Sequence, residues 1–205
     1  MIDKFDQLVL SLFKDYKFLQ GCAHPLLIGK LPDEILLEFD EFTNILKRTK
    51  NHKLSFLKNH LNVGMNKFQV SVPNNVLEDS FSFAFLNHLG EYYASLTTNQ
   101  SKEYYKRKVG LRRNHGHYDH YDLWINFIEH GDVNNWHNHG GHISGVIYID
   151  NDVGLTTNFE DGTKFLGKRG DIILFPSIFK HMVEENKSNK TRLTYAFNLE
   201  VTDVR

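Results

Sequence analysis

The second half of the chain contains a series of short apolar runs that are separated by turn residues and show no helical periodicity. Runs rich in β-branched and aromatic residues are typical of β-strands. Six of them follow residue 108, at 123–128, 143–149, 156–159, 163–166, 171–175 and 191–201. Asp161-Gly162, between two of these runs, is a strong hairpin signal. Strands in this number, without intervening helices, favour an antiparallel barrel or jelly roll.

The first half of the chain has mainly helical spacing. Residues 1–20 place apolar side chains three and four positions apart, and Pro32-Asp33-Glu34 is typical of the start of a helix, here expected to reach Leu46. Further helices are expected over 54–61 and 77–97, with one short strand at 68–72. We therefore expect a single α+β domain over 1–205, with a mainly helical part over 1–107 and a β-rich part over 108–205.

Charge and cysteine content limit the classes of partner and the cellular compartment. The 24 Lys plus Arg residues nearly balance the 25 Asp plus Glu residues, so there is no general attraction to nucleic acid or to an anionic membrane. The single cysteine, Cys22, excludes an intramolecular disulfide and fits a reducing compartment. The N-terminal segment mixes Asp and Lys into its apolar residues, which predicts neither a signal peptide nor a membrane span. These features predict a soluble, cytoplasmic protein and leave a homo-oligomer open.

Histidine is the outlier of the composition, with 12 residues. His137 and His139 lie two positions apart, and residues i and i+2 of a strand point to the same face. Two imidazoles could thus aim at one point, and His181, which follows a buried run and a turn, is the best candidate for a third. Three side-chain ligands with positions left open are the arrangement of catalytic rather than structural metal sites.

Three alternatives to this ligand set remain open. His142 competes with His139, although a spacing of three residues would place it on the opposite face of a strand. The cluster His115-Gly116-His117-Tyr118-Asp119-His120 is a second possible metal site, but it has no distant partner and Gly116 favours a solvated turn or a lid. The histidines could also be incidental members of an exposed turn, in a jelly-roll binding module without catalysis.

Arg192 lies inside the last apolar run of the chain. A guanidinium within a barrel is an unpaired buried charge unless an anionic group meets it. A carboxylate that accepts two hydrogen bonds is its natural partner. A structural ion pair with Glu184 or Glu185 is the alternative.

A set of short motifs lies between about residues 120 and 200. They are Trp124-Ile125-Asn126, His137-x-His139, Ser144-Gly145-Val146-x-Tyr148, Gly170-Asp171-x-x-x-Phe175-Pro176, His181 and Arg192-x-Thr194-x-x-Phe197-Asn198. Their order and spacing resemble those of the 2-oxoglutarate/Fe(II)-dependent oxygenases, and most closely a small prolyl-hydroxylase-like branch. The N-terminal 110 residues resemble no family.

The resemblance implies a C-terminal double-stranded β-helix, jelly-roll or cupin-like, buttressed by the N-terminal helices. It also implies a catalytic Fe(II) whose ligands are His137, His139 and His181. His139 stands where the family has Asp or Glu, so the site is neutral. Imidazole sites suit Zn(II) as well as Fe(II), so a histidine at position 139 leaves open which of the two metals is bound.

The resemblance further implies that 2-oxoglutarate is the co-substrate and that Arg192 binds its far carboxylate. Tyr148, Asn126 and Thr194 are additional candidate contacts of 2-oxoglutarate, chosen by their strand positions. The implied enzyme is a dioxygenase or hydroxylase that uses O2, oxidises a C–H bond and decarboxylates 2-oxoglutarate to succinate. A three-His, cupin-like metalloenzyme that does not use 2-oxoglutarate is the alternative. The substrate is not readable, and its specificity is expected in the loops 110–122 and 150–165.

Overall fold

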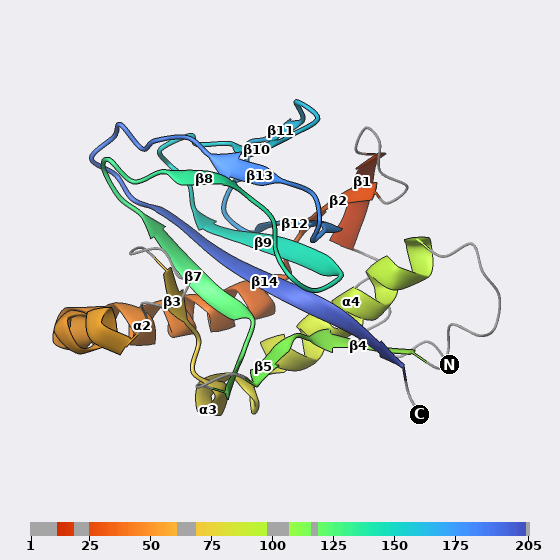
Figure 1. Cartoon of the computed structure of the whole chain (residues 1–205), viewed down its shortest axis with the longest axis horizontal. Coiled ribbons are helices and arrows are strands. Elements are labelled where there is room, and N and C mark those ends of the chain that lie inside the picture. The colour runs from red at the N-terminus through yellow and green to blue at the C-terminus, as the bar shows by residue number, and fades with distance from the viewer. Residues whose placement is uncertain (1–11, 19–24, 61–68, 98–106, 116–118, 204–205) are drawn as a thin grey trace.

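The structure is a computed structural model that describes residues 12–18, 25–60, 69–97, 107–115 and 119–203. A large and a small antiparallel sheet lie one above the other, and helices α2 and α4 lie on the far side of the large sheet (Figure 1). This arrangement confirms the expected α+β fold with a double-stranded β-helix. Among the described residues, no helix is both long enough and apolar enough to span a membrane.

The large sheet has eight strands in the order β1-β2-β12-β9-β14-β7-β3, with β4 also paired to β14. All neighbours are antiparallel. The strands are β1 Phe13–Phe18, β2 Pro25–Lys30, β3 Gln69–Ser71, β4 Arg107–Leu111, β7 Leu123–Ile128, β9 Ile143–Asp150, β12 Asp171–Pro176 and β14 Arg192–Asp203.

The small sheet has four strands in the order β11-β10-β13-β8. They are β8 Asn134–His137, β10 Thr157–Phe159, β11 Lys164–Phe165 and β13 His181–Val183. The predicted hairpin at Asp161-Gly162 joins β10 to β11. A separate hairpin pairs β5 Arg113–His115 with β6 Asp119–Tyr121.

The helices are α2 Asp33–His60, α3 Asn74–Leu77 and α4 Phe81–Thr97. The helix start expected at Pro32 is confirmed, and α2 is a single helix where two shorter ones were expected. Glu38 of α2 accepts hydrogen bonds from the backbone N–H groups of Phe81 and Ser82. Backbone N–H groups in the first turn of a helix find no acceptor within that turn, and Glu38 supplies one here, so it joins the two helices.

Alternating side chains of the large sheet fill two separate cores, as the two-residue period of a strand requires. On β9, Ile147 and Ile149 belong to the core shared with the helices. Val146 and Tyr148 belong instead to the core between the two sheets. Strand β9 is thus buried on both faces, which explains its uninterrupted apolar sequence.

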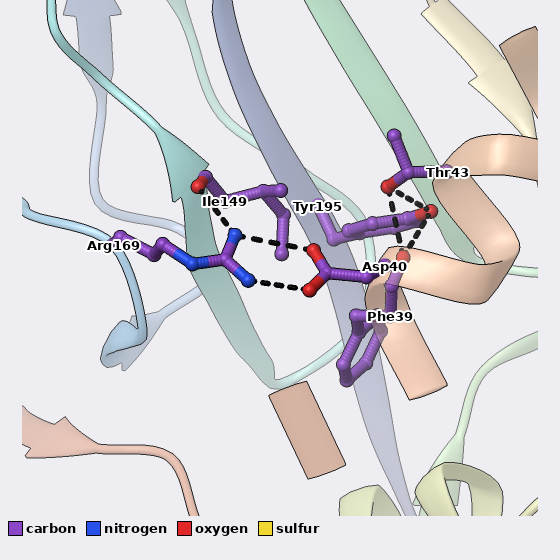
Figure 2. A network of polar contacts seen from close by, with 6 residues as sticks. All are labelled: Phe39, Asp40, Thr43, Ile149, Arg169 and Tyr195. Carbon is purple, nitrogen blue, oxygen red and sulfur yellow. Dashed lines mark hydrogen bonds and ion pairs between the residues drawn. The ribbon is translucent and has the colours of Figure 1, made fainter. Parts of the chain in front are cut away.

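Helix α2 is attached to the large sheet by a small polar network (Figure 2). Arg169, just before β12, binds the carboxylate of Asp40 with two nitrogens and also donates to the carbonyl of Ile149. On the other side of the helix turn, Thr43 Oγ1 lies 3.1 Å from the Tyr195 hydroxyl of β14. Helix α2 is therefore held against β9 and β14, although both strands lie far from it in the sequence.

The prediction of a helix over 1–20 is wrong for Phe13–Phe18, which form strand β1. Residues 1–11 and 19–20 of that prediction lie outside the described residues. The physical reason is pairing, because β1 lies against β2, and β2 in turn pairs with β12 from the second half of the chain. Strands β2, β4, β5, β6, β8 and β13 were also missed. Of these, β5, β6, β8 and β13 are too short to show a periodicity of their own.

Candidate metal centre

The small sheet places two of the predicted ligands side by side. His137 ends β8 and His181 begins β13, and the two residues are direct partners in the antiparallel register. Their ring centroids are 4.3 Å apart. His139 follows the end of β8, so it reaches the same point from a loop and not from the strand that its spacing predicted. Its ring lies 4.8 Å from that of His137 and 5.1 Å from that of His181.

The three imidazoles form a group that fits a metal ion. Their potential ligand nitrogens all lie within 4.8 Å of one another. In the described part of the chain, no other group of three or more His, Cys, Asp or Glu side chains has such geometry. Bonds of about 2.1 Å to one ion would bring three nitrogens to separations of roughly 3 to 3.5 Å. The upper limit of 4.8 Å is wider than these separations, so the rings would move closer together when a metal binds.

Backbone carbonyls orient two of these rings. His137 Nδ1 lies 2.6 Å from the carbonyl oxygen of Asn135, and His181 Nδ1 lies 3.1 Å from that of Phe179. A carbonyl accepts, so each Nδ1 carries the proton and each Nε2 keeps its lone pair. Metal-bound histidines have this second hydrogen bond almost without exception.

Burial keeps the three imidazoles neutral, which is the form that binds metal. Desolvation, together with the charge of the neighbouring His137, lowers the pKa of His139 to about 4. Desolvation, followed by the charges of His137 and His139, places the pKa of His181 well below its usual value. The pKa of His137 is also lowered by burial, against an opposing effect of its hydrogen bond to Asn135.

The alternative histidines lie elsewhere. His142 is exposed, and its Nδ1 accepts a hydrogen bond from the backbone N–H of Val201. The segment His115–His120 runs through the β5–β6 hairpin, of which residues 116–118 lie outside the described residues. Neither belongs to the three-His group, which among the described residues contains His139 and not His142.

Arg192 is buried between the two sheets. Its Nη2 donates to Thr157 Oγ1 at 3.0 Å, and the guanidinium carbon lies 5.1 Å from the centre of the Tyr148 ring. Burial lowers the pKa of Arg192, and the charge of Arg192 in turn contributes to the lowered pKa of His181. No ion pair joins Arg192 to a described carboxylate, so the alternative pairing with Glu184 or Glu185 is not found in that part of the chain.

The remaining predicted residues form a row across the large sheet. Tyr148 of β9, Thr194 of β14 and Asn126 of β7 are successive partners in the strand register. Asn126 Nδ2 donates to Thr194 Oγ1 at 3.4 Å, and the Tyr148 hydroxyl lies 2.6 Å from Thr157 Oγ1. All of these side chains are buried. The row therefore lies on the same face of the sheet as Arg192, two residues before Thr194.

Several buried polar atoms near the histidines have no hydrogen-bond partner among the described residues. They are Arg192 Nε, Asn126 Oδ1 and Trp124 Nε1. An unsatisfied buried polar atom costs about 1 to 3 kcal/mol, so these three atoms are available to hydrogen-bond a ligand or a water molecule. Trp124 is buried, and its ring lies 5.4 Å from that of His139.

Sequence reasoning missed Thr157 and the position of Trp124 beside His139. Thr157 contacts both Arg192 and Tyr148, but it comes from the small sheet and only the pairing of the two sheets brings it there. Trp124 carried a usable signal, since it lies two residues before Asn126 and so shares its face of β7.

Comparisons with known proteins agree with this geometry. A model of the family described as "Putative 2OG-Fe(II) oxygenase" matches residues 157–198, which include His181 and Arg192. The resemblance to the 2-oxoglutarate/Fe(II)-dependent oxygenases is confirmed. No curated protein matches the chain by sequence.

Several solved structures share the fold at low sequence identity. A prolyl 4-hydroxylase from Phytophthora capsici is 15% identical, with a TM-score of 0.53 over 98% of this chain and 66% of that chain. AviO1 from Streptomyces viridochromogenes Tue57 is 11% identical, with a TM-score of 0.51 over 99% and 96% of the two chains. The non-heme alpha ketoglutarate dependent carbocyclase SnoK of nogalamycin biosynthesis is 12% identical, with a TM-score of 0.50 over 87% and 81%.

At such identities the structural likeness shows the fold alone. Together, the family match and the fold indicate a 2-oxoglutarate/Fe(II) oxygenase, and the three-His group fits iron binding.

Proposed function

We propose that the protein is a 2-oxoglutarate- and Fe(II)-dependent dioxygenase that hydroxylates a C–H bond of its substrate. One atom of O2 enters the substrate as a hydroxyl group and the other enters succinate, with release of CO2 from 2-oxoglutarate. The observation that carries the proposal is the buried guanidinium of Arg192, which lies near the three-His group and has no carboxylate partner among the described residues. A dicarboxylate bound to the metal at one end would supply that partner at the other.

His137, His139 and His181 are the proposed metal ligands. Three neutral imidazoles leave positions open for a chelating co-substrate and for O2. When bound, Fe(II) supplies the activation of O2 that couples decarboxylation of the 2-oxo acid to oxidation of the C–H bond. The protein's own contribution is to hold the imidazoles neutral and oriented through the carbonyls of Asn135 and Phe179.

Arg192 is the proposed anchor for the far carboxylate of 2-oxoglutarate. Its unpartnered Nε donates to the carboxylate, while its Nη2 is held in place by Thr157. Tyr148, through its hydroxyl beside Thr157, is the proposed second donor to the same carboxylate. The side chains of Asn126 and Thr194 are proposed to contact the remainder of the co-substrate from β7 and β14.

Binding of 2-oxoglutarate tests this function without knowledge of the substrate. Protein purified without an affinity tag is loaded anaerobically with Fe(II) and titrated with 2-oxoglutarate, and binding is followed by the visible charge-transfer absorption of the chelate. Succinate formation is then measured in air. We expect binding to the wild type, and loss of binding in Arg192→Lys, because a lysine is a point charge that cannot make the bidentate contact.

The matched control is Arg169→Lys, which changes an arginine paired with Asp40 on the helical side of the sheet. It should bind 2-oxoglutarate as the wild type does. Full binding by Arg192→Lys, or a wild type that binds metal but not 2-oxoglutarate, would contradict the proposal. The second outcome would favour the three-His metalloenzyme that does not use 2-oxoglutarate, an alternative supported by the histidine at position 139.

A further inference from the structure

His139 is held differently from the other two proposed ligands. His137 and His181 are partners in the small sheet, so strand pairing sets their positions. His139 lies beyond the end of β8, in the segment 138–142, which we call the ligand loop. Something other than the sheet must therefore determine where its ring points.

The backbone of Ser177 clamps the ligand loop on both sides. The N–H of His139 donates to the Ser177 carbonyl at 3.0 Å, and the N–H of Ser177 donates to the carbonyl of His142 at 3.1 Å. Ser177 lies in the turn between β12 and β13 and is fully buried. The position of Ser177 thus sets the position of the ligand loop.

The side chain of Ser177 begins a chain of buried hydrogen bonds. Its Oγ lies 2.9 Å from Ser144 Oγ, which lies 2.7 Å from Asn198 Oδ1. Asn198 Nδ2 donates to the carboxylate of Asp122 at 3.2 Å. All four side chains are buried, with exposed fractions between 0% and 6%.

Counting the available protons fixes which group donates in each hydrogen bond of this series. The Asp122 carboxylate accepts from the Asn198 amide, which leaves Asn198 Oδ1 as an acceptor. Ser144 has one hydroxyl proton and gives it to that oxygen, so Ser177 must donate to Ser144. Each group is therefore oriented by the next one, and the orientation of Ser177 depends on Asp122. A buried network in which every member is satisfied is rigid.

Arg112 connects the far end of the chain to the same loop. Its Nη1 lies 3.4 Å from Asp122 Oδ2. A Cβ added at Gly140 would lie 2.3 Å from this nitrogen, so Arg112 packs directly on the backbone of the ligand loop. The loop is thus enclosed between Ser177 and Arg112, and both of these residues are held by Asp122.

We propose that Asp122, Asn198, Ser144 and Ser177 form a positioning relay, which holds the ligand loop and thereby orients His139. The inference rests on the metal site of the proposed function. It assigns a role to four buried polar residues that lie outside the ligand set. The relay sets the position of His139, whereas strand pairing sets the positions of His137 and His181.

Ser144→Ala tests the relay, with Ser82→Ala as the matched control. Both serines are buried, but Ser82 Oγ has no hydrogen-bond partner among the described residues. Backbone hydrogen exchange of the metal-free full chain measures the loop directly, and titration with Co(II) measures the site. We expect faster exchange at the His139 amide in Ser144→Ala, a Co(II) affinity lower by about tenfold and a changed Co(II) absorption spectrum. Ser82→Ala should match the wild type in all three.

A second pair of variants separates the relay from simple loss of packing, since Asn and Asp have nearly the same shape. Asn198→Asp should weaken Co(II) binding and speed exchange, because two carboxylates would face each other. Adding Asp122→Asn places an amide donor opposite the new carboxylate at position 198. The double variant should therefore recover most of the Co(II) affinity and most of the protection from exchange. Wild-type exchange and affinity in Ser144→Ala, or no recovery in the double variant, would overturn the relay. Failure of the wild type to bind Co(II) would overturn the metal site, whereas the exchange data would still decide whether the relay orders the loop.

Discussion

Replacement of Arg192 by methionine tests whether this guanidinium is retained for ligand binding rather than for folding. Arg192 is 2% exposed, donates to Thr157 at 3.0 Å and lies 5.1 Å from the centre of the Tyr148 ring. Its Nε has no partner among the described residues, and burial lowers its pKa. The free protein thus contains a buried charge with incomplete compensation.

The balance of these contributions predicts that Arg192→Met is more stable than the wild type in the absence of ligands. The hydrogen bond from the charged group stabilises by about 2 kcal/mol, and the cation–π contact by about 2 kcal/mol. Desolvation of the guanidinium costs several kcal/mol, and the unpaired Nε adds about 1 to 3 kcal/mol. We expect a net gain in the free energy of unfolding of about 1 kcal/mol, which raises Tm by about 2 to 4 °C in a chain of this size.

Thermal unfolding of the metal-free protein measures this gain, and a second scan with Mn(II) and 2-oxoglutarate measures the loss of function. The wild type should be stabilised by about 2.7 kcal/mol at a ligand concentration of about 100 times Kd, and Arg192→Met should not respond to 2-oxoglutarate. Arg169→Met is the control, with a loss of about 1 kcal/mol or less for a surface pair and a full ligand response. Destabilisation of Arg192→Met by about 3 kcal/mol or more, as for a broken buried ion pair, would refute the reasoning.

Three further perturbations probe the metal centre and the core. Chelation of the bound metal should lower the Tm of the wild type but not that of His181→Ala, since metal bound to the folded state adds to its stability; equal shifts would argue against this site. His139→Asp should raise the ratio of Fe(II) to Zn(II) retained in competition, as measured by elemental analysis, because two histidines and a carboxylate are the ligand set of non-heme Fe(II) oxygenases. An unchanged ratio would show that this position does not select the metal. Gly145→Ala should destabilise by about 2 to 3 kcal/mol in denaturant unfolding, because its Cβ would lie 2.1 Å from the buried Phe197 ring; wild-type stability would mean that this ring moves freely.

Much of the β-helix could be predicted from local patterns. The runs at 123–128, 143–149 and 171–175 became β7, β9 and β12, since a strand buried on both faces must be apolar throughout. The order of His137, His139, His181 and Arg192 along the chain was enough to propose a metal beside an anion site. These features depend on residue type and spacing, which the chain carries without its fold.

Other features depend on partners that are distant in the chain. Phe13–Phe18 have helical spacing, but an available edge of β2 makes them a strand, because hydrogen bonding to a neighbouring strand outweighs weak local propensity. His139 lies beside His137 and His181, but it approaches them from a loop that Ser177 holds and not from the strand that its spacing predicted. Thr157 and the relay from Ser177 to Asp122 have no signature in the sequence. A buried polar side chain takes its role from whichever group satisfies it, and that group is known only once the two sheets have come together.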